Sequence, residues 1–251
     1  MREKELKYDL ATIKNDEIIG HIMNLKDKVV VITGGCKGFG RAMARDFAEE
    51  GAKVVISSND RNELAKTARE ISADSFFADV TAQNDIDDLS KYVVNKYGRI
   101  DIWVNNAGIQ IAPARVEYVD IEKISKLFSV NFFAYFYGCQ AALKQMKKQG
   151  CGTIMNINST AGLEGKPELS AYCSSKFALR GLSEVIRAEN TNNNISVIDI
   201  HPGGMQSDIY KEQVPKDIKE YMLVKDVSRK VIENLKLEKP VTQLIIKRPK
   251  K

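Results

Sequence analysis

The chain has 251 residues, of which 43% are hydrophobic and 28% are charged, which is a globular composition long enough to bury a large core. The net charge of +5 is mild and dispersed apart from the tail KRPKK at residues 247–251, so no nucleic-acid partner is expected. The longest apolar runs have the length of strands and fall far short of the roughly 20 residues that span a bilayer. We expect one domain over residues 25–251, preceded by a charged extension over residues 1–24.

The location and redox setting follow from two further patterns. The N-terminal segment has neither the apolar stretch nor the small-residue cleavage site of a secretory signal, so we expect a cytoplasmic protein. The four cysteines, Cys36, Cys139, Cys151 and Cys173, lack the paired spacing of a zinc site. We therefore expect structural cysteines and no metal.

Short runs of β-branched residues alternate with longer amphipathic segments. The short runs predict strands over residues 29–33, 53–57, 75–78, 101–105, 153–158 and 195–200. The longer segments predict one helix that begins near Gly40 and four further helices over residues 61–71, 84–97, 120–148 and 171–190. Because the strands are apolar on both sides, this alternation predicts a doubly wound parallel sheet with helices on both faces. Ligands of such α/β sheets bind at the carboxyl ends of the strands.

The first predicted strand ends in a glycine-rich turn, TGGCKGFG at residues 33–40. Its glycines permit a tight turn, close approach of the backbone to a pyrophosphate and close packing of the next helix, whose N-terminal amides favour phosphate. The spacing differs from the G-x-G-x-x-G fingerprint, and such a turn can also be a mere connection. Its position between the first strand and the first helix favours dinucleotide binding.

Polar residues follow the other strands. Asp79 follows the third, and NNAG at residues 105–108 ends the fourth. A purely structural role as turn caps is an alternative for Asn105 and Asn106, since asparagine bonds nearby backbone readily. The small Ala107 and Gly108 leave room for a flat ligand above the sheet.

Tyr172 and Lys176, in AYCSSK, are four residues apart at the start of a predicted helix and so share one helical face. The spacing alone fits either a core tyrosine beside a solvated lysine or a phenol with a labile proton. Ser159 after the fifth strand and Asn131 on the preceding helix are candidate partners of the pair.

Taken in order, these motifs resemble the short-chain dehydrogenase/reductase family over about residues 26–247. The motifs are TGGCKGFG, NNAG, VNFF with Asn131, Ser159 followed by AYCSSK, and HPGGMQS. The resemblance implies a Rossmann fold and an oxidoreductase that acts on CH–OH groups, with reversible hydride transfer between a nicotinamide and a carbonyl or alcohol carbon.

The resemblance also assigns catalytic roles. Tyr172 resembles the general acid/base, Lys176 the neighbour that lowers its pKa and holds the nicotinamide ribose, and Ser159 the hydroxyl that orients the carbonyl. Asn131 resembles the fourth member, whose helix is locally distorted to keep a water in a proton relay. A free phenol titrates near 10, so we expect the adjacent ammonium and the oxidised nicotinamide to lower the pKa of Tyr172.

The predicted cofactor contacts follow the strand ends. They are Gly34, Cys36, Lys37, Gly38, Phe39, Gly40, Ser58, Asn59, Arg61, Asp79, Val80, Asn106, Ala107, Gly108, Tyr172, Lys176, Pro202, Gly203 and Ser207.

The choice between NADP(H) and NAD(H) depends on the end of the second strand. An acidic residue there would bind a free ribose 2'-hydroxyl, but Ser58 occupies the aligned position. Lys37 and Arg61 could neutralise a 2'-phosphate, so we expect NADP(H). Asn59, where many NADPH enzymes place arginine, and Asp60, which could turn toward the ribose, leave NAD(H) as the alternative.

The substrate and the assembly are less constrained. Residues 207–223 occupy the family's substrate-lid position, and this compact lid favours a modest ketone or aldehyde. The apolar lid residues are Ile209, Tyr210, Val214, Tyr221 and Met222. The ending VTQLIIKRPKK departs from the V-D-G-G of many 3-oxoacyl carrier reductases. Aromatic FFAYFYG at residues 132–138 lies on a helix through which family members usually form homodimers or homotetramers, although core packing would use the same residues.

Two other functions remain open at this point. One is an NAD-dependent alcohol dehydrogenase that works in the oxidative direction. The other is a non-catalytic dinucleotide-binding sensor, which would keep the glycine turn without needing the four catalytic residues.

Overall fold

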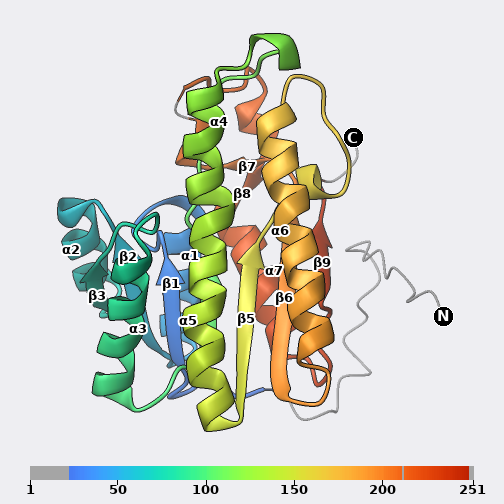
Figure 1. Ribbon diagram of the computed structural model, residues 1–251. Coiled ribbons are helices and arrows are strands. Elements are labelled where there is room, and N and C mark those ends of the chain that lie inside the picture. Colours follow the sequence, from blue (N-terminus) through green and yellow to red (C-terminus); the bar gives the residue numbers. More distant parts are fainter. Residues whose placement is uncertain (1–22, 211, 249–251) are drawn as a thin grey trace, which may run out of the picture.

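The computed structural model describes residues 23–210 and 212–248. Its centre is a sheet of seven parallel strands in the order β3-β2-β1-β4-β5-β6-β9 (Figure 1). The strands are β1 (Val29–Thr33), β2 (Lys53–Ser58), β3 (Asp74–Phe77), β4 (Ile102–Asn105), β5 (Cys151–Ile157), β6 (Asn194–Pro202) and β9 (Gln243–Ile246). The predicted doubly wound parallel sheet is confirmed.

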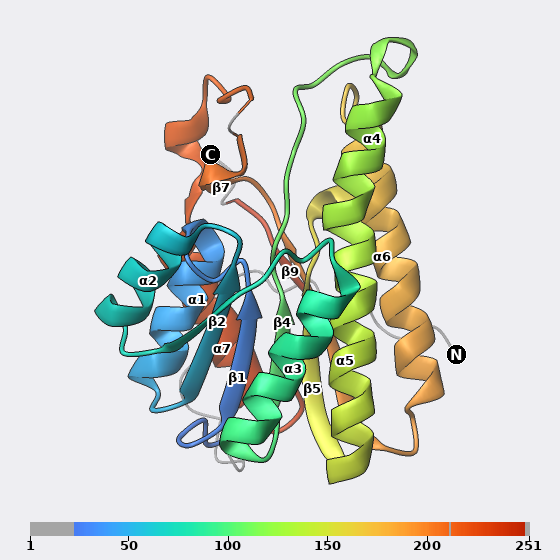
Figure 2. The same ribbon diagram turned by 60° about the vertical axis from the view of Figure 1, so that its left-hand side comes forward.

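Helices cover both faces of this sheet (Figure 2). They are α1 (Gly38–Glu49), α2 (Arg61–Glu70), α3 (Gln83–Tyr97), α4 (Ile121–Phe128), α5 (Ala134–Gln149), α6 (Ser170–Glu189) and α7 (Val224–Lys236). In one core, Val30 and Ile32 of β1 pack with residues of α1, α2 and α7. In the other, Val29 and Val31 pack with Trp103 and residues of α3, α5 and α6. Burial on both faces explains why the strand sequences are apolar throughout.

The helix α7 and the strand β9, which completes the sheet beyond β6, were not predicted from the sequence. In β9 only Leu244 and Ile246 are buried, so the strand has a brief apolar pattern that merges with the charged tail. Its pairing with β6, where His201 is the partner of Ile245, is a tertiary feature that no local pattern announces.

The single helix predicted over residues 120–148 is divided in the structure. A π-helical turn over Ser129–Phe133 joins α4 to α5. Such π turns inside α-helices occur frequently at functional sites. Here the turn contains Asn131, one of the predicted catalytic residues.

None of the described helices is long and apolar enough to cross a membrane. All four cysteines are free thiols. Residues 1–22, which form nearly all of the predicted N-terminal extension, lie outside the described residues.

Candidate active site

A cleft of about 1070 Å³ opens at the carboxyl ends of the parallel strands. The predicted cofactor residues that line it are Gly34, Cys36, Lys37, Gly38, Phe39, Gly40, Ser58, Asn59, Asp79, Val80, Asn106, Ala107, Gly108, Tyr172, Lys176, Pro202, Gly203 and Ser207. Arg61 is absent from the lining, because its guanidinium stacks 3.7 Å from the centroid of the Phe77 ring. The strand ends therefore converge on one cleft, as the sequence predicts.

The glycine turn between β1 and α1 needs its glycines for two reasons. Gly34 and Gly38 have φ angles of +63° and +51°, in the left-handed region that side chains disfavour. A Cβ on Gly40 would lie 2.3 Å from the carbonyl oxygen of Gly34, so a side chain there would push the turn apart. The close turn presents the backbone amides at the start of α1 to the cleft, an arrangement that binds phosphate.

The two asparagines at the carboxyl end of β4 have structural roles. The side-chain amide of Asn106 donates to the carbonyl oxygens of Thr33 and Gly34 at 2.9 and 3.1 Å, and so ties the glycine turn to the end of β4. The side-chain amide of Asn105 donates to the amide oxygen of Asn156 on β5 at 2.9 Å. Both residues fix the relative positions of neighbouring strand ends, and these bonds reach distant strands instead of the nearby backbone that a turn cap would bond.

An ion pair occupies the end of the cleft beside β2. The Lys37 ammonium lies 2.6 Å from a carboxylate oxygen of Asp60, which raises the pKa of Lys37 and lowers the pKa of Asp60. Asp60 also caps α2 by accepting from the backbone N–H of Glu63 at 3.1 Å. Of the two cations predicted at this end of the cleft, Lys37 is therefore paired with a carboxylate and Arg61 is turned away onto Phe77.

The predicted catalytic residues lie on neighbouring elements. Ser159 follows β5, and its hydroxyl lies close enough to that of Tyr172, in the first turn of α6, to lower the pKa of the phenol. Asn131 is fully buried: its amide oxygen accepts from the N–H of Ile109 and its amide nitrogen donates to the carbonyl oxygen of Ile109, both at 2.9 Å. The Asn131 side chain therefore holds the loop that follows β4 against the π turn.

Lys176 lies below this pair with only 3% of the residue exposed. Its ammonium donates to the carbonyl oxygen of Ile157 at 2.9 Å, and the same oxygen accepts from the hydroxyl of Tyr135 at 3.0 Å. The ammonium is 5.8 Å from the centroid of the Tyr172 ring. Burial lowers the pKa of Lys176 to about 7, although the carboxylate of Asp199 opposes the shift.

Residues 28–218, which hold the glycine turn and all four predicted catalytic residues, match the family model described as short chain dehydrogenase. The chain belongs to this family. An uncharacterised oxidoreductase from Bacillus subtilis is 36% identical over 190 residues, which are 72% of this chain and 53% of that protein. The match therefore spans about half the length of that relative.

Solved structures of dehydrogenases share the fold. An alcohol dehydrogenase from the archaeon Thermococcus sibiricus, complexed with 5-hydroxy-NADP, is 26% identical, with a TM-score of 0.81 over 90% of this chain and 100% of that one. A 3-ketoacyl-(acyl-carrier-protein) reductase from Brucella melitensis, complexed with NADH, is also 26% identical, with a TM-score of 0.82 over 89% and 98%. The two neighbours differ in cofactor, so the likeness leaves the choice between NADP(H) and NAD(H) open.

The pKa of Tyr172 in this short-chain dehydrogenase differs from the expectation. Burial raises it to about 12, and the hydrogen bond with Ser159 offsets only part of the shift. The expected lowering by Lys176 is missing, because burial brings the pKa of the lysine itself near neutrality and weakens its charge. The phenol of the protein alone is therefore protonated at neutral pH.

A buried polar network behind the catalytic residues was not predicted. Asp199 on β6 accepts from the hydroxyl of Ser183 at 2.5 Å and from the guanidinium of Arg187 at 3.4 Å. Ser183 in turn accepts from the side-chain amide of Asn156 at 2.9 Å. Burial raises the pKa of Asp199 to about 6. The signal was an aspartate inside the apolar run ISVIDI, a place that carboxylates rarely occupy unless they are paired.

The predicted lid folds over one side of the cleft. It contains the 3-10 turns Asp208–Tyr210 and Ile218–Glu220 and the strand β8 (Met222–Leu223), which pairs with β7 (Met205–Gln206) directly before the lid. The predicted lid residues in the cleft lining are Ile209, Tyr210 and Tyr221. Val214 is exposed instead, and Met222 packs against the core beneath α1 and α7.

Proposed function

We propose that this short-chain dehydrogenase reduces a ketone or an aldehyde with a hydride from NADPH. The observation that carries the proposal is the pair of neighbouring hydroxyls of Ser159 and Tyr172, which line the cleft together with the buried Lys176. Two hydroxyl donors at one point suit a carbonyl oxygen that gains negative charge as it is reduced.

The residues of the cleft fit a nicotinamide dinucleotide. The turn at residues 34–40 would hold the pyrophosphate. It is so tight that a Cβ on Gly40 would collide with the carbonyl oxygen of Gly34. Residues 79–80 would flank the adenine, and Pro202, Gly203 and Ser207 would approach the nicotinamide. When bound, the nicotinamide supplies the hydride or accepts it.

Tyr172 is the general acid in this proposal. Because its pKa is raised, the phenol keeps its proton at neutral pH and donates it to the carbonyl oxygen as charge grows there. Ser159 donates a second hydrogen bond to the same oxygen and so fixes its position. The charged form of Lys176, 5.8 Å from the Tyr172 ring, stabilises the phenolate that remains. Reduction is the favoured direction, since oxidation has to begin from that phenolate.

A panel of small carbonyl compounds tests the proposed function. We expect the absorbance of NADPH to fall with at least one ketone or aldehyde and to stay constant without a carbonyl. A panel that leaves both NADPH and NADH unchanged would contradict the proposal. Secondary alcohols with NAD⁺ in the same assay test the runner-up, an NAD-dependent alcohol dehydrogenase.

The preference for NADP(H) is supported by Lys37 and by the missing carboxylate at Ser58. The ammonium of Lys37 lines the cleft, and a 2'-phosphate would replace Asp60 as its partner. Asp60 would keep its contact with the N–H of Glu63, so the start of α2 need not move. The same carboxylate favours the runner-up, because it could accept a hydrogen bond from a free ribose hydroxyl.

We expect Lys37→Met to weaken NADPH binding at least about tenfold and to change NADH binding little, since only NADPH carries the phosphate. Asp60→Asn should strengthen NADPH binding, because it removes the carboxylate that competes for Lys37. Calorimetric titration of both cofactors against the wild type and both variants measures these effects. Equal or tighter binding of NADH by the wild type would overturn the preference.

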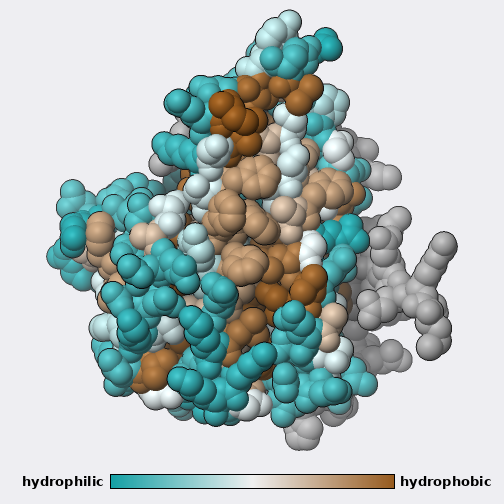
Figure 3. Space-filling view, viewed as in Figure 1, coloured by the Kyte–Doolittle hydropathy of each residue, from teal (hydrophilic) through white to brown (hydrophobic). Residues whose placement is uncertain are grey.

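We also infer that two copies pair through the outer face of α5 and α6. Figure 3 shows hydrophobic side chains running down the middle of this face. Its exposed members are Phe133, Phe136, Phe177 and Val185, at 48%, 38%, 43% and 54%. Contiguous apolar surface of this kind marks protein interfaces, and a two-fold pairing would cover it on both copies.

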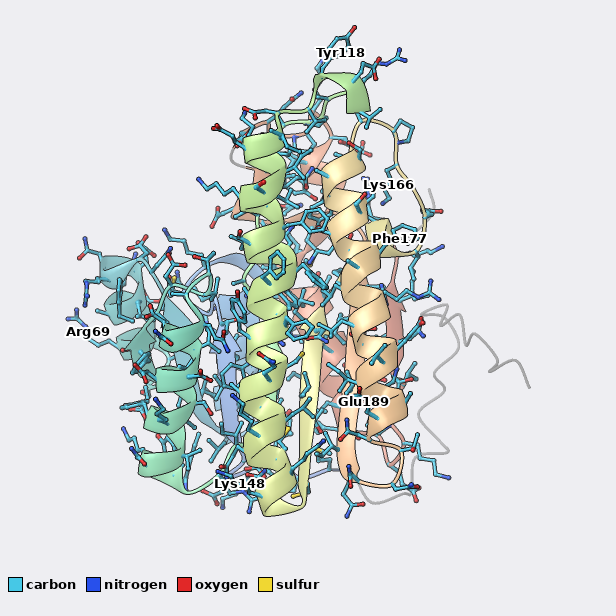
Figure 4. All side chains as sticks on the ribbon, in the orientation of Figure 1. Arg69, Tyr118, Lys148, Lys166, Phe177 and Glu189 are labelled. Carbon is cyan, nitrogen blue, oxygen red and sulfur yellow. The ribbon has the colours of Figure 1, made fainter. Side chains whose placement is uncertain are left out.

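Phe177→Lys should therefore convert a dimer into a monomer, because it places a charge at the centre of the pairing face. Tyr118→Lys is the matched control, since Tyr118 is 75% exposed but lies at the far tip of the molecule (Figure 4). Size-exclusion chromatography with light scattering gives the masses. A monomeric wild type, or a Phe177→Lys dimer, would refute the pairing.

A further inference from the structure

Lys166 begins a constrained turn in the loop between β5 and α6. The N–H of Leu169 donates to the carbonyl oxygen of Lys166 at 3.2 Å, Pro167 is the second residue of the turn, and Glu168 is the third with a φ of +65°. Proline followed by a left-handed residue is the type II pattern, which normally has glycine third. A glutamate held in this conformation is strained, and such strain gathers at functional sites.

A second contact fixes this turn beside the cleft. The N–H of Ala114, in the loop that follows β4, donates to the carbonyl oxygen of Glu168 at 2.9 Å. Ala114 and Leu169 also form a parallel bridge between the two loops. The turn that begins at Lys166 is thus held by its own hydrogen bond and by the loop that follows β4. Lys166 itself lines the cleft.

The side chain of Lys166 reaches toward the reacting groups. Its ammonium donates to the hydroxyl of Thr160 at 2.9 Å. Thr160 starts the 3-10 turn Thr160–Gly162 and directly follows Ser159, which lines the cleft together with Tyr172. The Lys166 ammonium therefore contacts the residue next to Ser159, whose hydroxyl is proposed to bind the carbonyl oxygen.

This ammonium has no carboxylate partner among the described residues. Glu164 and Glu168, which flank Lys166 in the sequence, are exposed and form no ion pair with it. Glu212 of the lid lies 3.5 Å from Lys123 instead. A half-buried cation in a ligand cleft, bonded only to a neutral hydroxyl, is available to an anionic group of a ligand.

We propose that Lys166 binds an acidic group of the substrate, and that the substrates are short oxo acids with a carboxylate a few bonds from the carbonyl. The assignment rests on the proposed reductase function and specifies its substrate class. The ammonium fixes which end of the molecule lies at Ser159 and Tyr172, so it orients the carbonyl for reduction. A phosphate ester would satisfy the same ammonium, and the experiment separates the two anions.

Matched pairs of substrates measure the preference. Pyruvate, 3-oxobutanoate and 4-oxopentanoate are each compared with their neutral methyl esters, and dihydroxyacetone phosphate is compared with dihydroxyacetone. We expect kcat/KM for the best oxo acid to exceed that of its ester by at least about tenfold, through KM. A preference for dihydroxyacetone phosphate over every oxo acid would overturn the carboxylate assignment.

Variants of Lys166 test the residue itself. Lys166→Met should raise KM for the best oxo acid at least about tenfold and leave its ester unchanged, whereas Lys166→Arg should restore most of the preference. Lys148→Met is the control: Lys148 is an exposed lysine at the opposite end of the paired helices from Lys166 (Figure 4). Lys148→Met should leave KM unchanged for both the oxo acid and its ester.

Binding separates the failure of this inference from the failure of the proposed function. Calorimetry with Tyr172→Phe, in which turnover is strongly slowed, measures the affinity for each acid in the presence of NADPH, with and without Lys166→Met. Oxo-acid binding that depends on Lys166 supports the inference even if no carbonyl is reduced. Carbonyl reduction with no preference for acids, or an equal effect of Lys166→Met on acid and ester, refutes the inference and leaves the reductase function standing. Absence of both binding and turnover refutes both.

Discussion

Replacing Tyr172 with phenylalanine should lower kcat for carbonyl reduction by roughly 10²- to 10⁴-fold, which is the usual contribution of a positioned general acid. The variant keeps the ring that the Lys176 ammonium approaches at 5.8 Å and loses only the hydroxyl that donates the proton. NADPH binding should stay within about twofold, because the pyrophosphate site lies in the turn at residues 34–40. Single-turnover kinetics and calorimetry measure the two quantities.

Tyr137→Phe is the matched control for this variant, since Tyr137 is a partly buried tyrosine that packs against the core beneath α3 and α5. It should leave kcat unchanged. Ser159→Ala should lower kcat less than Tyr172→Phe does, because it removes a hydrogen bond to the oxygen but leaves the proton donor. If Tyr172→Phe retains more than about a tenth of the wild-type kcat, another group donates the proton.

The parts of the site that the sequence predicts are those set by local pattern. The glycine turn has to follow a strand and precede a helix, and the steric reason for Gly40 lies only six residues away in Gly34. Tyr172 and Lys176 share a helical face by their spacing alone. Strand ends of a parallel sheet converge on one edge, so residues after several strands could be placed in one cleft before any contact was known.

The parts that escaped prediction depend on distant contacts. The ion pair of Lys37 with Asp60 joins residues of two different loops, and the stacking of Arg61 on Phe77 removes from the cleft a cation that its sequence position places there. The pKa of Tyr172 depends on how deeply the surrounding elements bury its hydroxyl, which no spacing reveals. Spacing predicted that Lys176 would act on the phenol, whereas burial decides how much charge the lysine retains.

That burial leads to a second large effect. Lys176→Met should abolish most carbonyl reduction and at the same time raise the free energy of unfolding of the cofactor-free protein by roughly 1–4 kcal/mol at pH 7 and below. Methionine fills a similar volume without a charge to desolvate. The carbonyl oxygen of Ile157 keeps a donor after the substitution, because the hydroxyl of Tyr135 also bonds it at 3.0 Å.

The pH dependence of this gain distinguishes desolvation from any other cause. The pKa of Lys176 is about 7 in the folded protein and 10.5 in the unfolded chain, so between these values the unfolded chain binds more protons. The contribution of Lys176 to stability therefore rises with pH across this window, and the cost of the buried ammonium is full below pH 7 and vanishes toward pH 10.5. Urea denaturation of both proteins across this range should show the advantage of Lys176→Met shrinking as pH rises, while the exposed Lys148→Met shows no trend.

A variant that is less stable than the wild type at every pH would mean that the bond from Lys176 to Ile157 outweighs the cost of desolvation. The predicted sign instead means that the fold gives up stability to hold an ammonium beneath the phenol.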